Sequence, residues 1–239
     1  MDDTTHLDFC PELVAMLKSG ETRGRSKNFP TLVAVSTVNN LVTLKNLCTS
    51  LKPKRTLEVG LAFGGSGLLF TACHRENKVA PAQQHVAIDP FQSCTWDSAG
   101  AVVIEKAGLS GFFELMEKPS CLAMPALIEK GVTFDIIYID GSHIFEDVFV
   151  DLYFAIRLLS DGGIVALDDC TDPHVKKVIK FIERNGQVSL EPFDLSPFRE
   201  DKGLTPRYRV AKLLGKTQMR AFRKIGPNDR PWNSPFTDF

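Results

Sequence analysis

Five short apolar runs, separated by segments with helical periodicity, constrain the fold of this 239-residue chain more than any other sequence feature. The runs are continuous and rich in β-branched and aromatic residues, which is typical of strands buried on both faces of a parallel sheet. They occupy residues 56–60, 85–90, 112–116, 134–140 and 163–168. Between them apolar residues recur at helical spacing, for example over 145–159, and 175–182 follows the last run in the same way. This alternation predicts an α/β fold with an open, mostly parallel sheet and helices on both faces.

The residues before the first strand are predicted to form a helical cap segment, 1–50. Apolar spacing predicts one short helix over 11–18 and a longer one over 31–51, which Pro53 ends. The first residues are acidic and polar, unlike a signal peptide. No apolar run approaches the roughly 18 residues of a membrane span. We therefore expect a soluble, cytoplasmic protein with no membrane partner.

The alternation stops beyond residue 186. The strand-like runs 188–193 and 208–214 have no helix between them, so we expect about seven strands, with an antiparallel pair at one edge. Residues 216–239 are predicted to be a basic tail, because the chain from Lys202 onward has nine Lys or Arg against two Asp. The whole chain is nearly neutral, with 28 basic and 29 acidic residues, so we do not expect a nucleic-acid partner.

Acidic residues recur at the ends of the predicted strands. Glu58 lies in the first strand, Asp89 ends the second, Asp140 the fourth, and Asp168 and Asp169 the fifth. The carboxyl ends of parallel strands form the edge at which ligands of open sheets bind. Asp is depleted in strands, so its recurrence here indicates a functional edge.

A glycine-rich loop follows the first strand. Gly60, Gly64 and Gly67 allow a tight turn and the close approach of a ligand to the backbone. Their spacing departs from the GxGxxG fingerprint of nicotinamide-binding proteins, because Phe70 stands where the last glycine would fall. Asp89 follows at a distance suited to a ribose, since a carboxylate accepts hydrogen bonds from two hydroxyls. The alternative is a turn for strand–helix packing with a capping Asp.

Three carboxylates, Asp140, Asp168 and Asp169, are expected to converge on a metal ion. Carboxylates this close repel one another unless a proton or a cation intervenes, and oxygen ligands favour Mg²⁺ or Mn²⁺. Capping of the following turn and helix is the alternative role for these residues. His143 lies three residues after Asp140, where an imidazole can take a proton from a hydroxyl, or can be a surface histidine.

These motifs resemble those of the class I S-adenosylmethionine-dependent methyltransferases. The pattern Glu58-x-Gly60-x-x-x-Gly64-x-Ser66 is similar to their first motif, and residues 88–91 to their second. Residues 134–143 resemble the fourth motif, and 158–163 the turn before the fifth strand. The resemblance implies a Rossmann-like methyltransferase domain over 51–215. It implies that the cofactor contacts include Glu58, Gly60, Phe63, Gly64, Ser66, Asp89, Pro90, Ser120 and Asp140.

Within that superfamily, the Asp140-Gly-Ser-His143 and Asp168-Asp169 motifs resemble those of Mg²⁺-dependent O-methyltransferases of sugars and natural products. The resemblance implies S-adenosylmethionine as cofactor, Mg²⁺ or Mn²⁺ on Asp140, Asp168 and Asp169, and His143 as the catalytic base beside Asp140. We expect a small hydroxylated acceptor and allow for a homo-oligomer. The alternatives are a metal-independent methyltransferase, and an RNA methyltransferase that uses the basic tail.

Overall fold

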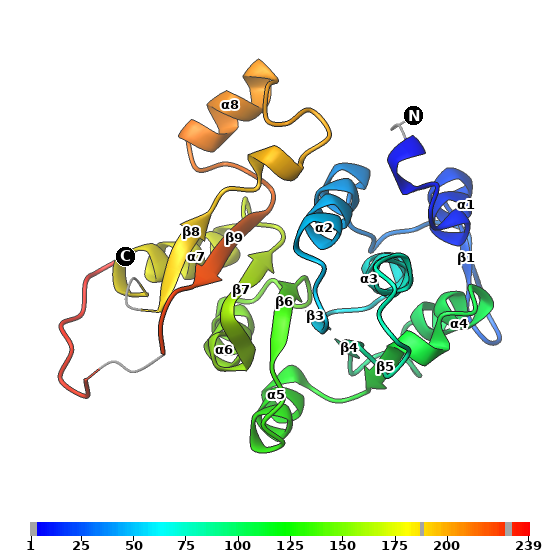
Figure 1. The fold of residues 1–239 in the computed structure, drawn as a ribbon, viewed down its shortest axis with the longest axis horizontal. Helices are drawn as coiled ribbons and strands as arrows, with labels where there is room; N and C mark the ends of the chain where they lie inside the picture. The colour runs from blue at the N-terminus through cyan, green and yellow to red at the C-terminus, as the bar shows by residue number, and fades with distance from the viewer. Residues whose placement is uncertain (1–3, 187–188, 228–230) are drawn as a thin grey trace.

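A seven-stranded sheet forms the centre of the computed structural model, which describes residues 4–186, 189–227 and 231–239 (Figure 1). The strands are ordered β5-β4-β3-β6-β7-β9-β8. Their bounds are β3 Thr56–Val59, β4 His85–Ile88, β5 Phe113–Met116, β6 Phe134–Ile139, β7 Leu159–Leu167, β8 Leu190–Phe193 and β9 Arg220–Lys224. Neighbours from β5 to β7 run parallel, whereas β9 is antiparallel to both β7 and β8. The predicted Rossmann-like sheet with an antiparallel pair at one edge is confirmed.

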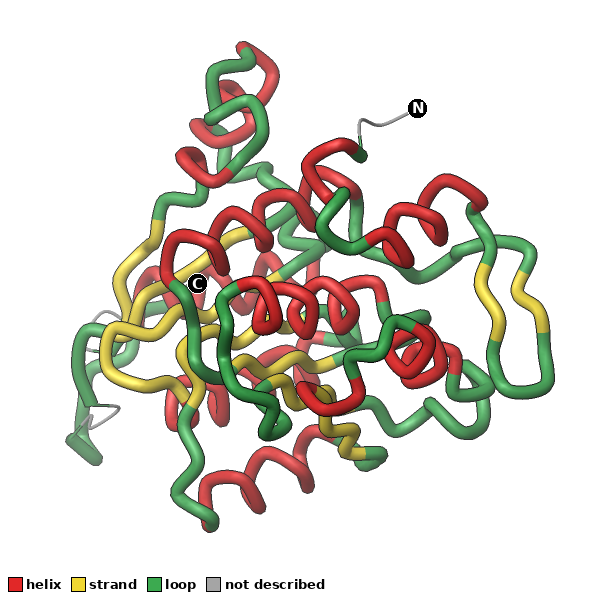
Figure 2. Tube along the Cα trace, turned by 45° about the vertical axis from the view of Figure 1, so that its right-hand side comes forward, coloured by secondary structure: helices red, strands yellow, loops and turns green. Residues whose placement is uncertain are grey.

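Helices pack on both faces of this sheet, as Figure 2 shows for the red helices around the yellow strands. One core lies between the sheet and α1, α2 and α3, and the other between the sheet and α5, α6 and α7. The helix bounds are α1 Pro11–Ser19, α2 Val38–Leu51, α3 Gly65–Glu76, α4 Ala99–Lys106, α5 Ser120–Glu129, α6 Phe145–Leu158, α7 Pro173–Asn185 and α8 Pro206–Leu213. Within the described ranges, no helix combines the length and the apolar content needed to span a bilayer.

The strand register brings the ends of four strands together. Val59 of β3 pairs with Ile88 of β4 and with Ile139 of β6, and Ile139 in turn pairs with Leu167 of β7. The next residue on each strand therefore lies at the same edge of the sheet. These next residues are Gly60, Asp89, Asp140 and Asp168.

The N-terminal segment packs on α3 and reaches the carboxyl edge of the sheet. It contains the 3₁₀ helix Thr5–Leu7, α1, a short hairpin of β1 Thr22–Arg23 and β2 Asn28–Phe29, and α2. The helix predicted over 11–18 is confirmed. The helix predicted from residue 31 begins only at Val38, because Thr37 caps it, its Oγ1 accepting a hydrogen bond from the Asn40 backbone N–H at 3.3 Å. Residues 33–37 are thereby left to line the edge of the sheet.

The prediction of a strand over 208–214 is wrong, because most of this run belongs to helix α8. Thr205 lies at the N-cap position and Pro206 at the first helical position, which favours a helix, and the apolar Val210 and Leu213 stay exposed. The second strand of the antiparallel pair is instead β9, from the segment predicted to be a tail. Residue 188 of the other predicted strand lies outside the described residues, and β8 begins at Leu190.

Truncation of Phe222 tests whether β9 contributes to the hydrophobic core. Its side chain is 1% exposed and packs with the apolar residues beneath α6 and α7. We expect Phe222→Ala to lower the free energy of unfolding by about 3–5 kcal/mol, the cost of truncating a buried aromatic side chain. Urea denaturation measures this. Phe236→Ala, at a position 62% exposed, is the control and should change stability by less than about 0.5 kcal/mol.

Candidate active site

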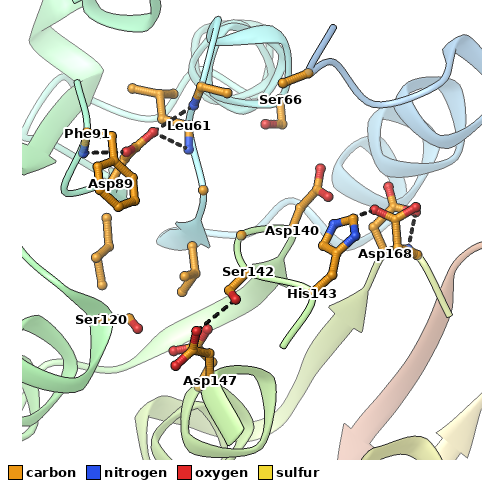
Figure 3. A pocket seen from close by; sticks show the side chains of 18 of the residues that line it. Leu61, Ser66, Asp89, Phe91, Ser120, Asp140, Ser142, His143, Asp147 and Asp168 are labelled. Atoms are coloured by element: carbon orange, nitrogen blue, oxygen red, sulfur yellow. Dashed lines mark hydrogen bonds and ion pairs between the residues drawn. The ribbon is translucent and has the colours of Figure 1, made fainter. Parts of the chain in front are cut away.

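A cavity of about 1060 Å³ opens at the carboxyl edge of the sheet (Figure 3). Its walls come from the residues after β3, β4, β6 and β7, from the starts of α3 and α5, and from the segment before α2. Figure 3 shows Asp89 and Ser120 on one side of it and Asp140, His143 and Asp168 on the other. We call these the Ser120 end and the His143 end.

The glycine loop between β3 and α3 packs closely against its neighbours. Gly60 has a φ of 93°, and a Cβ there would lie 2.3 Å from the carbonyl oxygen of Asp140. Gly64 has a φ of 85°, and its Cβ would lie 2.7 Å from the Cα of Gly100. Only glycine satisfies both the positive φ and this close approach. The loop thereby presents its backbone and Ser66 to the cavity.

Asp89 fixes the glycine loop to the end of β4. Its Oδ2 accepts hydrogen bonds from the backbone N–H groups of Leu61 at 3.2 Å and Ala62 at 2.8 Å, and from Gln92 Nε2 at 2.9 Å. Its Oδ1 accepts one, from the Phe91 backbone N–H at 2.8 Å. A carboxylate oxygen has two lone pairs, so Oδ1 can accept a further hydrogen bond from a ligand in the cavity.

Of the nine residues predicted to contact a cofactor, six line the cavity and three do not. Those that line it are Gly60, Ser66, Asp89, Pro90, Ser120 and Asp140. Glu58 is fully buried, and its Oε1 lies 3.0 Å from His85 Nε2. Phe63 is 1% exposed and packs between the rings of Phe29 and Trp96. Glu58, Phe63 and Gly64 therefore support the loop from behind it.

A compact cluster of Asp140, His143 and Asp169 forms the His143 end. One ligand atom of each residue lies within 4.8 Å of the others. His143 Nε2 lies 2.8 Å from Asp169 Oδ2, and Asp140 Oδ2 accepts a hydrogen bond from Ser36 Oγ at 2.9 Å. This arrangement can hold a divalent cation between carboxylates, or orient an imidazole to take a proton.

Asp168 lies at the same end but has a different environment from the one predicted. Both of its carboxylate oxygens accept hydrogen bonds from Asn40 Nδ2, at 2.8 and 2.9 Å. The Tyr138 hydroxyl and the Asp169 backbone N–H also donate to it, and the residue is 5% exposed. The structure thus groups His143 with Asp140 and Asp169, and metal binding by Asp168 stays a prediction.

Negative charge accumulates at the His143 end. Burial and the neighbouring Asp168 carboxylate hold the pKa of Asp140 well above its usual range. Burial also raises the pKa of Asp168, against the lowering effect of its Tyr138 and Asn40 hydrogen bonds. A bound cation or proton would relieve this repulsion, as expected of a site that takes a cationic group.

The sequence analysis missed Asp151 at the Ser120 end. Asp151 lies on α6, lines the cavity, and is 1% exposed, while its Oδ1 has no hydrogen-bond partner among the residues that the structure describes. Burial raises the pKa of Asp151 to about 6, despite a hydrogen bond from Ser120. The available signal was its position within the apolar stripe of α6. A carboxylate there is buried, and a buried carboxylate needs a partner, which can be a ligand. Asn40 and Ser36 were also missed, since nothing in their local sequence links them to the strand ends.

Comparison with known proteins shows what this chain is similar to. Residues 57–170 match the family model of a methyltransferase domain. TomG, an O-methyltransferase from Streptomyces achromogenes solved with S-adenosylmethionine, shares the fold with a TM-score of 0.60 at 16% identity, covering 95% of this chain and 91% of TomG. The SAH-bound methyltransferase PaMTH1 from Podospora anserina gives 0.62 at 16% identity, covering 94% and 88%. Cofactor-bound Rv0187 from MTB gives 0.62 at 18% identity, covering 91% of each chain. No curated protein sequence matches the chain.

The fold and the site together resemble those of class I methyltransferases. Its sheet order, its glycine loop and the sequence match over residues 57–170 all point to this class. Residues 57–170 thus match the methyltransferase domain that the motifs predicted.

Asp151 gives the ligand-free protein a specific pH dependence. Its pKa is about 6 in the folded protein and near 3.8 when unfolded, so the folded state binds the proton more tightly. The contribution of Asp151 to stability is therefore lost as pH rises from about 4 to 6. We expect Asp151→Asn to be more stable than the wild type at pH 7.5, by up to about 3 kcal/mol, with the difference shrinking toward pH 4.

Urea denaturation of the ligand-free protein at several pH values measures this difference. Asp161→Asn, at an exposed position that does not line the cavity, is the control and should show no such pH-dependent gain. A loss of stability in Asp151→Asn that is the same at every pH would contradict the assignment.

Proposed function

We propose that the protein transfers a methyl group from S-adenosylmethionine to a hydroxyl of a small molecule. The observation that carries the proposal is one continuous cavity, which joins the glycine loop and Asp89 to the His143 cluster. The names of TomG and of other similar structures, which are O-methyltransferases, support a hydroxyl acceptor.

The Ser120 end suits the nucleoside part of the cofactor. Asp89 Oδ1 would accept a hydrogen bond from a ribose hydroxyl, and the glycine loop lines the cavity beside it. Ser120 and Asp151 line the far side. The exocyclic amine of adenine is a hydrogen-bond donor that would satisfy the unpartnered Oδ1 of Asp151. The methionine part then extends toward Asp140, so that the methyl group faces His143.

The His143 end suits a divalent cation and a base. The carboxylates of Asp140 and Asp169 would hold Mg²⁺ or Mn²⁺, for which oxygen ligands are preferred. Such a cation would orient a hydroxyl and make it more acidic. His143 would then take the hydroxyl proton, with Asp169 orienting its ring at 2.8 Å.

The transfer itself is an in-line displacement. The acceptor oxygen forms a bond to the methyl carbon while the bond from that carbon to the sulfonium breaks, and the hydroxyl proton passes to His143. The products are the methyl ether and S-adenosylhomocysteine. The enclosing walls contribute mainly by holding the two reactants in line, which can lower a barrier by about 7–11 kcal/mol.

Three basic residues of the expected tail contact the rest of the fold, which favours a small acceptor over the RNA alternative. Arg220 pairs with Glu183, and Arg223 lies 4.0 Å from Glu191 and over the ring of Phe193. Lys224 Nζ donates to the Leu159 carbonyl oxygen at 2.7 Å. These contacts hold β9 in the sheet, so its basic residues do not form a separate nucleic-acid-binding segment.

Binding of S-adenosylhomocysteine is the first test of the proposed function. We expect calorimetry to show micromolar binding both with Mg²⁺ and with EDTA, because the metal lies at the acceptor side of the cavity. Asp151→Asn should weaken this binding by about ten-fold, the effect of one charged hydrogen bond. Asp161→Asn, which removes an exposed carboxylate outside the cavity, is the control. No binding under either condition would contradict the proposed function.

His143→Gln tests the catalytic base. We expect turnover, measured as S-adenosylhomocysteine released with a panel of hydroxylated acceptors, to fall by about 10²–10⁴-fold. The affinity for S-adenosylhomocysteine should stay within two-fold, roughly, because His143 lies at the acceptor end. His6→Gln, at an exposed histidine paired with Glu200, is the control. An unchanged rate in His143→Gln would remove this residue from the mechanism.

A further inference from the structure

A second cleft, of about 340 Å³, adjoins the His143 end of the cavity. Its walls come from α2, from α8, from the 3₁₀ helix Ser196–Phe198 with its flanking residues, and from the loop before β9. Figure 1 shows α8 standing away from the sheet on the side of α2. Thr37, Asn40 and Gln218 line both the cleft and the cavity, so the two spaces share a wall.

The cleft meets the cavity at the catalytic carboxylates. Asn40, on the shared wall, donates side-chain hydrogen bonds to both carboxylate oxygens of Asp168. Gln218, also on the shared wall, donates to Asp169 through its Nε2. The cleft thus begins where the acceptor hydroxyl must lie, on the opposite side from Ser120 and Asp151. A molecule in the cleft would extend the acceptor and not the cofactor.

The charge of the cleft is positive. Its lining includes Arg199, Arg207 and Lys216 and, among the described residues, no Asp or Glu. Asp201 Oδ1 accepts a hydrogen bond from Arg199 Nε at 3.0 Å, and the guanidinium of Arg199 lies 3.9 Å from the ring centroid of Tyr208. Across 4–186, 189–227 and 231–239, no carboxylate forms an ion pair with Arg207 or Lys216. These two cations are therefore available to an anionic ligand.

The remaining wall is mostly polar and hydrogen-bonding. Hydroxyl groups come from Thr43, Thr205 and Thr217, and amides from Asn39 and Asn40. Such a surface suits a hydroxylated ligand. By contrast, the Ser120 end of the main cavity is lined by the apolar residues Ile88, Pro90 and Phe91. Hydroxyl and amide groups would bind the polar body of a ligand, and the two cations its anionic group.

We propose that the methyl acceptor carries a carboxylate or a phosphate, which Arg207 and Lys216 bind in this cleft while the reacting hydroxyl lies at His143. This proposal rests on the proposed function and narrows its acceptor to an anionic hydroxylated molecule, such as a sugar acid or a sugar phosphate. Arg207 is suited to a two-pronged contact with either oxyanion, and Lys216 acts as a point charge. Both are exposed, so their effect weakens as ionic strength rises.

The test is equilibrium binding of three probes to the full-length protein, with and without saturating S-adenosylhomocysteine and Mg²⁺. The probes are glucose 6-phosphate, glucuronate and glucose. Ligand-observed NMR titration measures the binding of each. The first two separate phosphate from carboxylate, and glucose is the neutral reference. We expect at least one anionic probe to bind more tightly than glucose, and Arg207→Ala with Lys216→Ala to weaken that probe by about ten-fold.

The matched control is the double variant Arg209→Ala with Lys202→Ala. It removes the same charge from the same region, but neither residue lines the cleft, and both are exposed. This control should leave binding of the anionic probes within about two-fold. Equal weakening in both double variants, or no preference of the wild type for either anionic probe over glucose, would overturn the proposal.

Two further outcomes separate the proposal from its alternatives. Failure of S-adenosylhomocysteine to bind the wild type contradicts the proposed function, and the probe titrations without cofactor still report on the cleft. Binding of a single-stranded RNA oligonucleotide that depends on Arg207 and Lys216 and exceeds that of both sugar anions would overturn the small-acceptor proposal in favour of nucleic acid.

Discussion

The parallel register of β4, β3, β6 and β7 is the constraint on which the rest of the site depends. Because Val59 pairs with both Ile88 and Ile139, the residues that end these strands lie at one edge of the sheet. Side chains that are far apart in the sequence then surround a single cavity. The close approach of Gly60 to the Asp140 carbonyl oxygen shows how tightly this edge is packed. A slip of the register would separate the glycine loop from the carboxylates.

Concentrating carboxylates at this edge costs free energy, and much of the compensation comes from the N-terminal segment. Asn40 donates to both oxygens of Asp168, and Ser36 donates to Asp140. Thr37 begins α2 at the position that aims Asn40 at the sheet. The cap segment is thus part of the site, because without it Asp168 would be buried with fewer donors. The charge that remains at Asp140 and Asp169 is what a cation and a proton-accepting histidine can use.

The motifs identified the cavity but not which of the predicted side chains line it. Asp89, Ser66 and Ser120 line the cavity as expected, since each follows a strand or begins a helix at a predictable place. Glu58 was assigned by its motif to the cofactor, yet it points away from the cavity and pairs with His85, because successive strand residues face opposite sides. Asp151 was missed because its place in the cavity wall depends on where α6 packs against α5.

The sequence by itself determined the order of strands and helices, the glycine loop and the acidic strand ends, because these depend on local periodicity and on residue type. It did not determine the secondary structure of the C-terminal segment. Strand β9 has charged residues on both sides of Ala221 and Phe222, and only pairing with β7 and β8 makes it a strand. Likewise, the grouping of His143 with Asp140 and Asp169, and the basic cleft between α2 and α8, join residues distant in the chain. Such groupings arise from tertiary packing, since no local pattern records which distant side chains will meet.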